Sequence, residues 1–284
     1  PDDHGNDAGG PRFTLDAKVA RVWMGPGRFM DNVRGTFVND GRKWRRMSME
    51  SQVGEGKLFT ADISETGDGK RSMAIHADDA GAVLRVFDYY ENMIGGTMTV
   101  LGEYDDMTVG SPLKGRLEIR DYRVVRAPAI AHLVSILALT GIIDALEGDG
   151  LAFKQLAAPF VISDGVLEFN DARASGTSLG FTASGKFYTH AEMMNVEGTV
   201  IPAYLINAIW GRIPILGKLF TGGEEGGGVF AANFRMTGPK DDPEISVNPL
   251  SALAPGFLRN VFGIFSRTDT PETQGEDKKT PTAQ

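Results

Sequence analysis

Hydrophobic and polar residues alternate along most of this chain, with the period of two that is typical of β-strands with one buried face. The runs 13–19 and 179–187 carry this pattern over the longest distances. Shorter runs repeat it, and their apolar members include Phe59, Ile63, Ile75, Leu117, Ile119, Leu167, Phe169, Phe230 and Phe234. The pattern indicates about fourteen strands, which at ~4.8 Å per strand would form a sheet roughly 65 Å long.

Aspartate-glycine pairs separate several of these runs at the spacing expected of β-hairpins. They occur at Asp40-Gly41, Asp68-Gly69, Asp149-Gly150 and Asp164-Gly165. Because so many strands seldom lie in one flat sheet, we expect the sheet to curl or to split. The sequence therefore predicts a mostly β fold with a few α-helices, built as an elongated, curled antiparallel sheet that forms a repeating β-groove.

Two helices are predicted between groups of strands. The first is capped by Asp79 and runs to about Met93, where Gly95-Gly96 would end it. The second begins at Pro128, runs to about Leu146, and is apolar almost all round.

Two further apolar or amphipathic helices are predicted nearer the C-terminal end, after Pro202 and after Pro255. From residue 266 onward the chain is polar and rich in Thr, Pro and charged residues, so we expect it to be disordered.

Composition excludes several functional classes. The chain has 284 residues, a net charge of −8 and no long basic run, so we expect no binding to nucleic acid. There is no cysteine, which removes disulfides and thiol nucleophiles. The longest uncharged stretch of the helical region, residues 127–143, is shorter than the roughly 20 apolar residues that span a bilayer as a helix.

Candidate catalytic chemistry is weak. The letters of Gly176 to Gly180 match the G-x-S-x-G nucleophile elbow around Ser178, but that motif needs a helix after the turn, whereas 179–187 alternates as a strand. The four histidines are far apart and have no metal-ligand spacing. We therefore predict a non-enzymatic protein with neither cofactor nor metal.

From Leu117 to Phe262 the sequence resembles the C-terminal region of the AsmA-like superfamily, in particular the bridge-like lipid-transfer proteins of the YhdP and TamB type. The segments that carry the resemblance are 115–119, 127–133, 163–167, 198–207, 213–217, 234–239 and 247–256. The likeness extends upstream over 79–96, whereas residues 1 to about 70 match only in their strand pattern. On this basis we expect β-groove strands in 1–114, an AsmA-like C-terminal region in 115–265 and a disordered tail in 266–284.

The resemblance implies a periplasmic protein of the Gram-negative envelope, anchored to the inner membrane through a segment that precedes Pro1. It implies passage of phospholipid between the inner and outer membranes, with acyl chains on one apolar face of the sheet. The residues expected to line that lipid groove are Phe13, Leu15, Val19, Phe59, Ile63, Ile75, Leu117, Ile119, Leu167, Phe169, Leu179, Phe181, Phe187, Phe230 and Phe234. Glycine and alanine on the same face, such as Gly35 and Gly198, are expected to leave room along the sheet.

The two C-terminal helices are expected to face a membrane surface, most simply the outer membrane, or another envelope protein. The residues expected at this contact are Tyr204, Trp210, Arg212, Lys218, Phe257, Leu258, Val261 and Phe262. Two alternatives stay open. The helices could instead plug the end of the sheet, and the chain could be a periplasmic scaffold that assists assembly of outer-membrane proteins.

Overall fold

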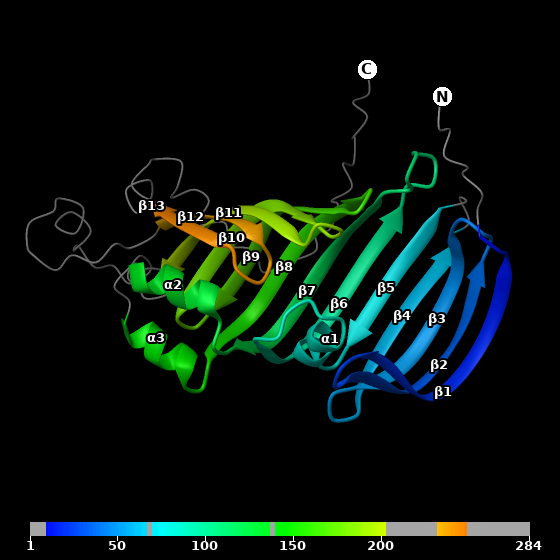
Figure 1. Ribbon diagram of the computed structural model, residues 1–284, viewed down its shortest axis with the longest axis horizontal. Helices are drawn as coiled ribbons and strands as arrows, with labels where there is room; N and C mark the ends of the chain where they lie inside the picture. Colours follow the sequence, from blue (N-terminus) through cyan, green and yellow to red (C-terminus); the bar gives the residue numbers. More distant parts are fainter. Residues whose placement is uncertain (1–9, 67–69, 137–139, 203–231, 249–284) are drawn as a thin grey trace, which may run out of the picture.

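The computed structural model describes residues 10–66, 70–136, 140–202 and 232–248 (Figure 1). Within these ranges, strands account for most residues. The first seven strands are β1 (Phe13–Gly25), β2 (Arg28–Asn39), β3 (Trp44–Val53), β4 (Lys57–Glu65), β5 (Arg71–Ala77), β6 (Met93–Tyr104) and β7 (Leu113–Val124). The remaining strands are β8 (Leu151–Ser163), β9 (Val166–Gly176), β10 (Leu179–Tyr188), β11 (Met193–Pro202), β12 (Ala232–Pro239) and β13 (Glu244–Asn248).

All thirteen strands belong to one antiparallel sheet in which each strand pairs with its neighbour in the sequence. The sheet curls without closing, because β1 and β13 remain its two edges (Figure 1). The predicted fold class, a curled and mostly antiparallel β structure with few helices, is confirmed. The sheet continues through residues 114 and 115, which lie within β7.

The Asp164-Gly165 pair forms the predicted hairpin turn between β8 and β9. Both residues have positive φ angles, 49° for Asp164 and 74° for Gly165, as a two-residue turn of this kind requires. Gly41 has a positive φ angle of 95° in the connection between β2 and β3. Gly150 has one of 85°, but it joins a helix that ends at Glu147 to β8, so the hairpin expected at Asp149-Gly150 was wrong. The Asp68-Gly69 pair lies outside the described residues.

Three of the described strands contain a left-handed residue other than glycine in their interior. Asn32 in β2, Asp121 in β7 and Asp171 in β9 have φ angles of 52°, 53° and 58°. Asparagine and aspartate tolerate this conformation better than other residues with a Cβ atom. Each of them interrupts the alternation, so that apolar residues on both sides of the irregularity face the same way, and the strand bends there.

The first helix, α1 (Ala80–Val86), is shorter than predicted. Asp79 caps it as expected, because its Oδ1 atom accepts a 2.8 Å hydrogen bond from the Ala82 amide. The helix ends early because Asp88 adopts a left-handed conformation, with a φ of 62°. Gly95-Gly96 therefore does not end a helix but lies within β6, and the prediction of a helix up to Met93 was wrong.

Where one helix was predicted from Pro128 to Leu146, the structure has two, α2 (Pro128–Ile136) and α3 (Thr140–Glu147). The helices predicted after Pro202 and Pro255, and the tail from 266, lie outside the described residues. None of the helices in the described ranges is long and apolar enough to cross a membrane.

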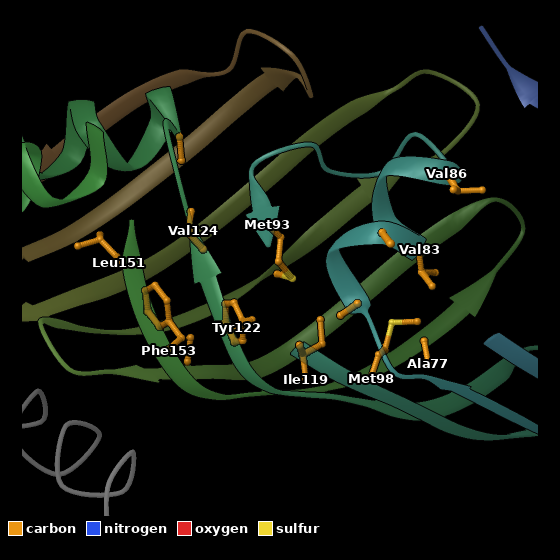
Figure 2. Close-up of a cluster of buried hydrophobic side chains, with 14 of the residues drawn as sticks. Ala77, Val83, Val86, Met93, Met98, Ile119, Tyr122, Val124, Leu151 and Phe153 are labelled. Atoms are coloured by element: carbon orange, nitrogen blue, oxygen red, sulfur yellow. The ribbon is translucent and has the colours of Figure 1, made fainter. Parts of the chain in front are cut away.

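The hydrophobic core lies between one face of the sheet and the helices. Val83 and Val86 of α1 pack with side chains of the sheet such as Met98 and Ile119 (Figure 2). Val134 of α2 and Leu146 of α3 belong to the same cluster, and both are fully buried. The helices therefore cover the apolar face near one end of the strands.

The turn after α1 contacts residues from both ends of the sheet. The Asp88 carboxylate lies 2.7 Å from Arg28 Nη1, which belongs to the start of β2. The Asp88 carbonyl accepts a 3.3 Å hydrogen bond from Lys240 Nζ, which follows β12. Because α1 packs on the apolar face, the sheet curls toward that face, and the apolar face is concave.

Candidate functional site

A continuous row of side chains without charge crosses the concave face through all thirteen strands. We call it the central row, and the cross-strand pairing defines it residue by residue. Its members are Leu15, Phe37, Met47, Ile63, Met73, Gly102, Gly115, Phe160, Phe169, Gly185, Val196, Met236 and Ile245. At ~4.8 Å per strand, its length is roughly 58 Å.

The central row is accessible to a ligand, whereas a neighbouring row is not. Most members of the central row are half-buried, Leu15 is 50% exposed, and only Ile63 and Val196 are buried. This second row lies four or five residues farther along each strand on the same face, toward the strand ends that carry the helices. Its buried members are Phe59, Ala77, Met98, Ile119, Ala174, Val200 and Ala232. The helices therefore leave the central row as the surface on which an apolar molecule could lie.

The opposite face of the sheet is polar. The row that alternates with the apolar ones consists of Lys18, Arg34, Glu50, Thr60, His76, Thr99, Glu118, Ala157, Arg173, Thr182, Thr199, Asn233 and Asn248. Glu118 pairs with Arg116 at 2.9 Å and with Arg120 at 3.2 Å on this convex side. Along these rows the two faces thus differ in chemistry, and the concave face is the one that offers a continuous apolar surface.

Glycines on the concave face are covered by aromatic rings instead of leaving empty space. A Cβ atom at Gly115 would lie 2.6 Å from Phe160 Cζ, and one at Gly198 would lie 2.8 Å from Phe234 Cζ. Gly35 has the same relation to Phe37, at 3.0 Å. The expectation that these glycines leave room was therefore wrong. They let aromatic rings lie close to the backbone, so these side chains project less far from the sheet.

The concave face gathers the residues predicted to line a groove, but in three different environments. Phe13, Leu15 and Val19 on β1 are 41%, 50% and 41% exposed. The half-buried members are Ile75, Leu117, Leu167, Phe169, Phe181 and Phe187. The buried members, which the helices and neighbouring strands cover, are Phe59, Ile63, Ile119, Leu179 and Phe234. Phe230 lies outside the described residues.

The eight residues predicted to face a membrane or a partner also lie outside the described residues. They are Tyr204, Trp210, Arg212, Lys218, Phe257, Leu258, Val261 and Phe262. Sequence reasoning missed Phe160, although it occupies the eighth position of the central row. It follows Pro159 in an apolar run that does not alternate, and only its spacing of two from Ile162 could have identified its face.

A charged cluster lies on the concave face at the starts of β3 and β5 and after the end of β6. Arg71 is only 4% exposed, and its Nε and Nη2 atoms donate 2.8 Å hydrogen bonds to both carboxylate oxygens of Asp106. Its guanidinium also lies 4.0 Å from the centroid of the Tyr104 ring. Lys43 Nζ adds a 2.8 Å contact to Asp106. These hydrogen bonds hold the pKa of Asp106 well below its usual value, so the carboxylate stays ionised and neutralises Arg71.

The sequence motif around Ser178 does not form a nucleophile elbow. β9 ends at Gly176 and β10 begins at Leu179, so Ser178 lies in a hairpin connection that leads into a strand. In the described ranges, no group of three His, Asp or Glu side chains is placed to hold a metal ion.

Burial among apolar groups raises the pKa values of Tyr90 and Tyr122, that of Tyr90 to about 12.

Comparisons with protein-family models, with curated proteins and with solved structures find no match to this chain. The resemblance to AsmA-like proteins therefore rests on the sequence segments that carry it.

Proposed function

We propose that this chain is a non-catalytic conduit for phospholipid, in which acyl chains lie along the central row and polar head groups stay in water. The single observation that supports this proposal most strongly is the continuity of the central row, which crosses thirteen strands without a charged side chain. An enzyme or a selective binding protein needs a local site, whereas this apolar surface extends along the whole sheet.

The dimensions suit acyl chains. The central row is roughly 58 Å long, and half of a bilayer's hydrocarbon core is about 15 Å thick, so roughly four chains fit end to end. Each methylene that such a face shields completely from water gains about 0.8 kcal/mol, the same value as in a bilayer. Acyl chains would then move between membrane and protein with little change in free energy. Because rings lie flat over the glycines, few side chains project into the path of a moving acyl chain.

The resemblance to AsmA-like proteins gives the proposal its cellular setting. It supports a proposed location in the periplasm of a Gram-negative envelope, where the chain would carry phospholipid between the inner and outer membranes. Neither a cofactor nor a catalytic group is needed for such passage, because the lipid is not changed chemically.

Native mass spectrometry of the purified 284-residue chain tests this function. We expect adducts with masses of one or more phospholipids, which disappear after delipidation and return on incubation with liposomes. A folded chain that takes up no phospholipid under these conditions would overturn the proposal.

The edge strand β1 favours a second candidate, a scaffold for assembly of outer-membrane proteins. β1 is thirteen residues long and regular over most of its length, while the other edge strand, β13, has five residues. A long uncovered edge can pair with an extended segment of another chain. Photocrosslinkers placed along β1 distinguish the candidates, since a scaffold would capture an unfolded β-barrel protein there and a conduit would not.

A further inference from the structure

The connection between β6 and β7 carries the two most exposed large apolar side chains of the described residues. Met107 is 92% exposed and Val109 is 96% exposed. Figure 1 shows this connection extending beyond the strand ends. Single exposed apolar residues are ordinary on protein surfaces, but here two stand on one loop with only Thr108 between them. We call residues 107–110 the β6–β7 tip.

The base of this loop is held in place by polar contacts, which fix the position from which the tip projects. Asp106 is tied to buried Arg71 and to Lys43 at 2.8 Å. Thr108 Oγ1 donates a 2.8 Å hydrogen bond to Asp105, and the Asp105 amide donates one of 2.8 Å to the Pro112 carbonyl. Met107 and Val109 therefore project from a loop whose base is fixed by hydrogen bonds and ion pairs.

We propose that the β6–β7 tip inserts Met107 and Val109 into a phospholipid bilayer and attaches the protein to a membrane surface. Two side chains on a narrow projection offer far less area than the roughly 800 Å² that each partner contributes to a stable protein interface. A bilayer requires no complementary surface, and it receives each apolar side chain separately. The inference does not rest on the lipid conduit, since attachment and cargo use different parts of the molecule.

The charges around the base agree with this occupant. The carboxylates of Asp105 and Asp106 are matched in number by the cations of Lys43 and Arg71, and Lys114 near Asp105 is matched by Asp164 beside Gly110, so the base carries no excess of positive charge. Binding should therefore come from insertion instead of electrostatic attraction. It should persist on neutral phosphatidylcholine vesicles and at 1 M salt, where the screening length is about 3 Å.

Flotation of the whole chain with phosphatidylcholine vesicles tests the proposal. The double variant Met107→Asp/Val109→Asp should reduce the bound fraction by more than about tenfold, because each lost insertion alone corresponds to at least that factor. The matched control is Ile94→Asp/Leu101→Asp, which adds the same charge on the convex face, where these side chains are 50% and 59% exposed. The control should bind as the parent does, and circular dichroism should show that both variants are folded.

The other outcomes also decide the question. Equal flotation of the parent and the tip variant, or binding restricted to anionic vesicles and lost in high salt, would overturn the proposal. So would a concentration-dependent dimer that only the tip variant loses, because the occupant would then be a second copy of the chain. Native mass spectrometry separates this inference from the proposed function, since the tip variant should keep its bound phospholipid even when it no longer floats.

Discussion

Replacing Phe160 by Glu should stop lipid transfer while leaving much lipid binding intact. Phe160 is half-buried on β8 and lies in the central row between Gly115 and Phe169. A carboxylate at this position would have to lose water whenever an acyl chain passes, or the chain would have to leave the face. Burying a polar group without a partner costs at least about 2 kcal/mol, which corresponds to a roughly 30-fold slower passage.

The position of the block explains why binding should survive. β8 is the eighth of thirteen strands, so stretches of roughly 34 Å and 24 Å of central row remain on either side of it. Both exceed the roughly 15 Å of half a hydrocarbon core. Native mass spectrometry should therefore still detect phospholipid in the variant.

The assay is transfer of a fluorescent phospholipid between donor and acceptor vesicles. Val161→Glu is the matched control, because Val161 is the next residue on β8, faces the polar side, and has one basic and one acidic neighbour, Lys114 and Glu168. It should transfer lipid at the parental rate. Parental transfer by a folded Phe160→Glu variant would refute the central row as the path.

Three further outcomes follow from the structure. Asp106→Ala should lower the free energy of unfolding by about 3–5 kcal/mol in urea titrations, because it leaves buried Arg71 without its partner. The pKa of Asp106 is depressed in the folded state, so its contribution to stability should be complete above its ordinary value of 3.8 and decline as the pH falls below it, which acid titration of the parent and Asp106→Ala would reveal. Ser178→Ala should leave both lipid transfer and stability unchanged. Loss of transfer in a folded Ser178→Ala variant would support the alternative that the protein is a hydrolase.

Alternation predicted most of the strands, and their number predicted that the sheet curls, but the apolar run of β8 does not alternate and was missed. Each hairpin pairs neighbouring segments, so the topology depends on local signals such as the Asp164-Gly165 turn. The left-handed residues within strands could not be predicted, because nothing in the local sequence separates Asn32 or Asp171 from an ordinary solvent-facing residue. They become visible only as breaks in alternation, such as the spacing of three between buried Met30 and Val33.

The candidate site was harder to predict than the face on which it lies. Period two assigns Ile119 and Phe169 equally to the apolar side, but it does not show which of them a helix covers. In the structure Ile119 is 1% exposed beneath the helices, while Phe169 stays half-buried. This difference depends on where α1 packs, and α1 was predicted with the wrong length.

An open sheet suits the proposed function better than a closed barrel of the same strands. In a closed barrel, β1 would pair with β13, and a lipid head group would have to enter the apolar interior or be left behind at one end. In the described residues, β1 and β13 do not pair, and the two ends meet at the turn after α1, where Arg28 and Lys240 both contact Asp88. The Arg28–Asp88 ion pair is partly exposed, so it contributes at most about 1 kcal/mol to holding the two ends near each other. The face therefore stays concave and apolar but open along its length, which lets acyl chains lie inside while head groups remain in water.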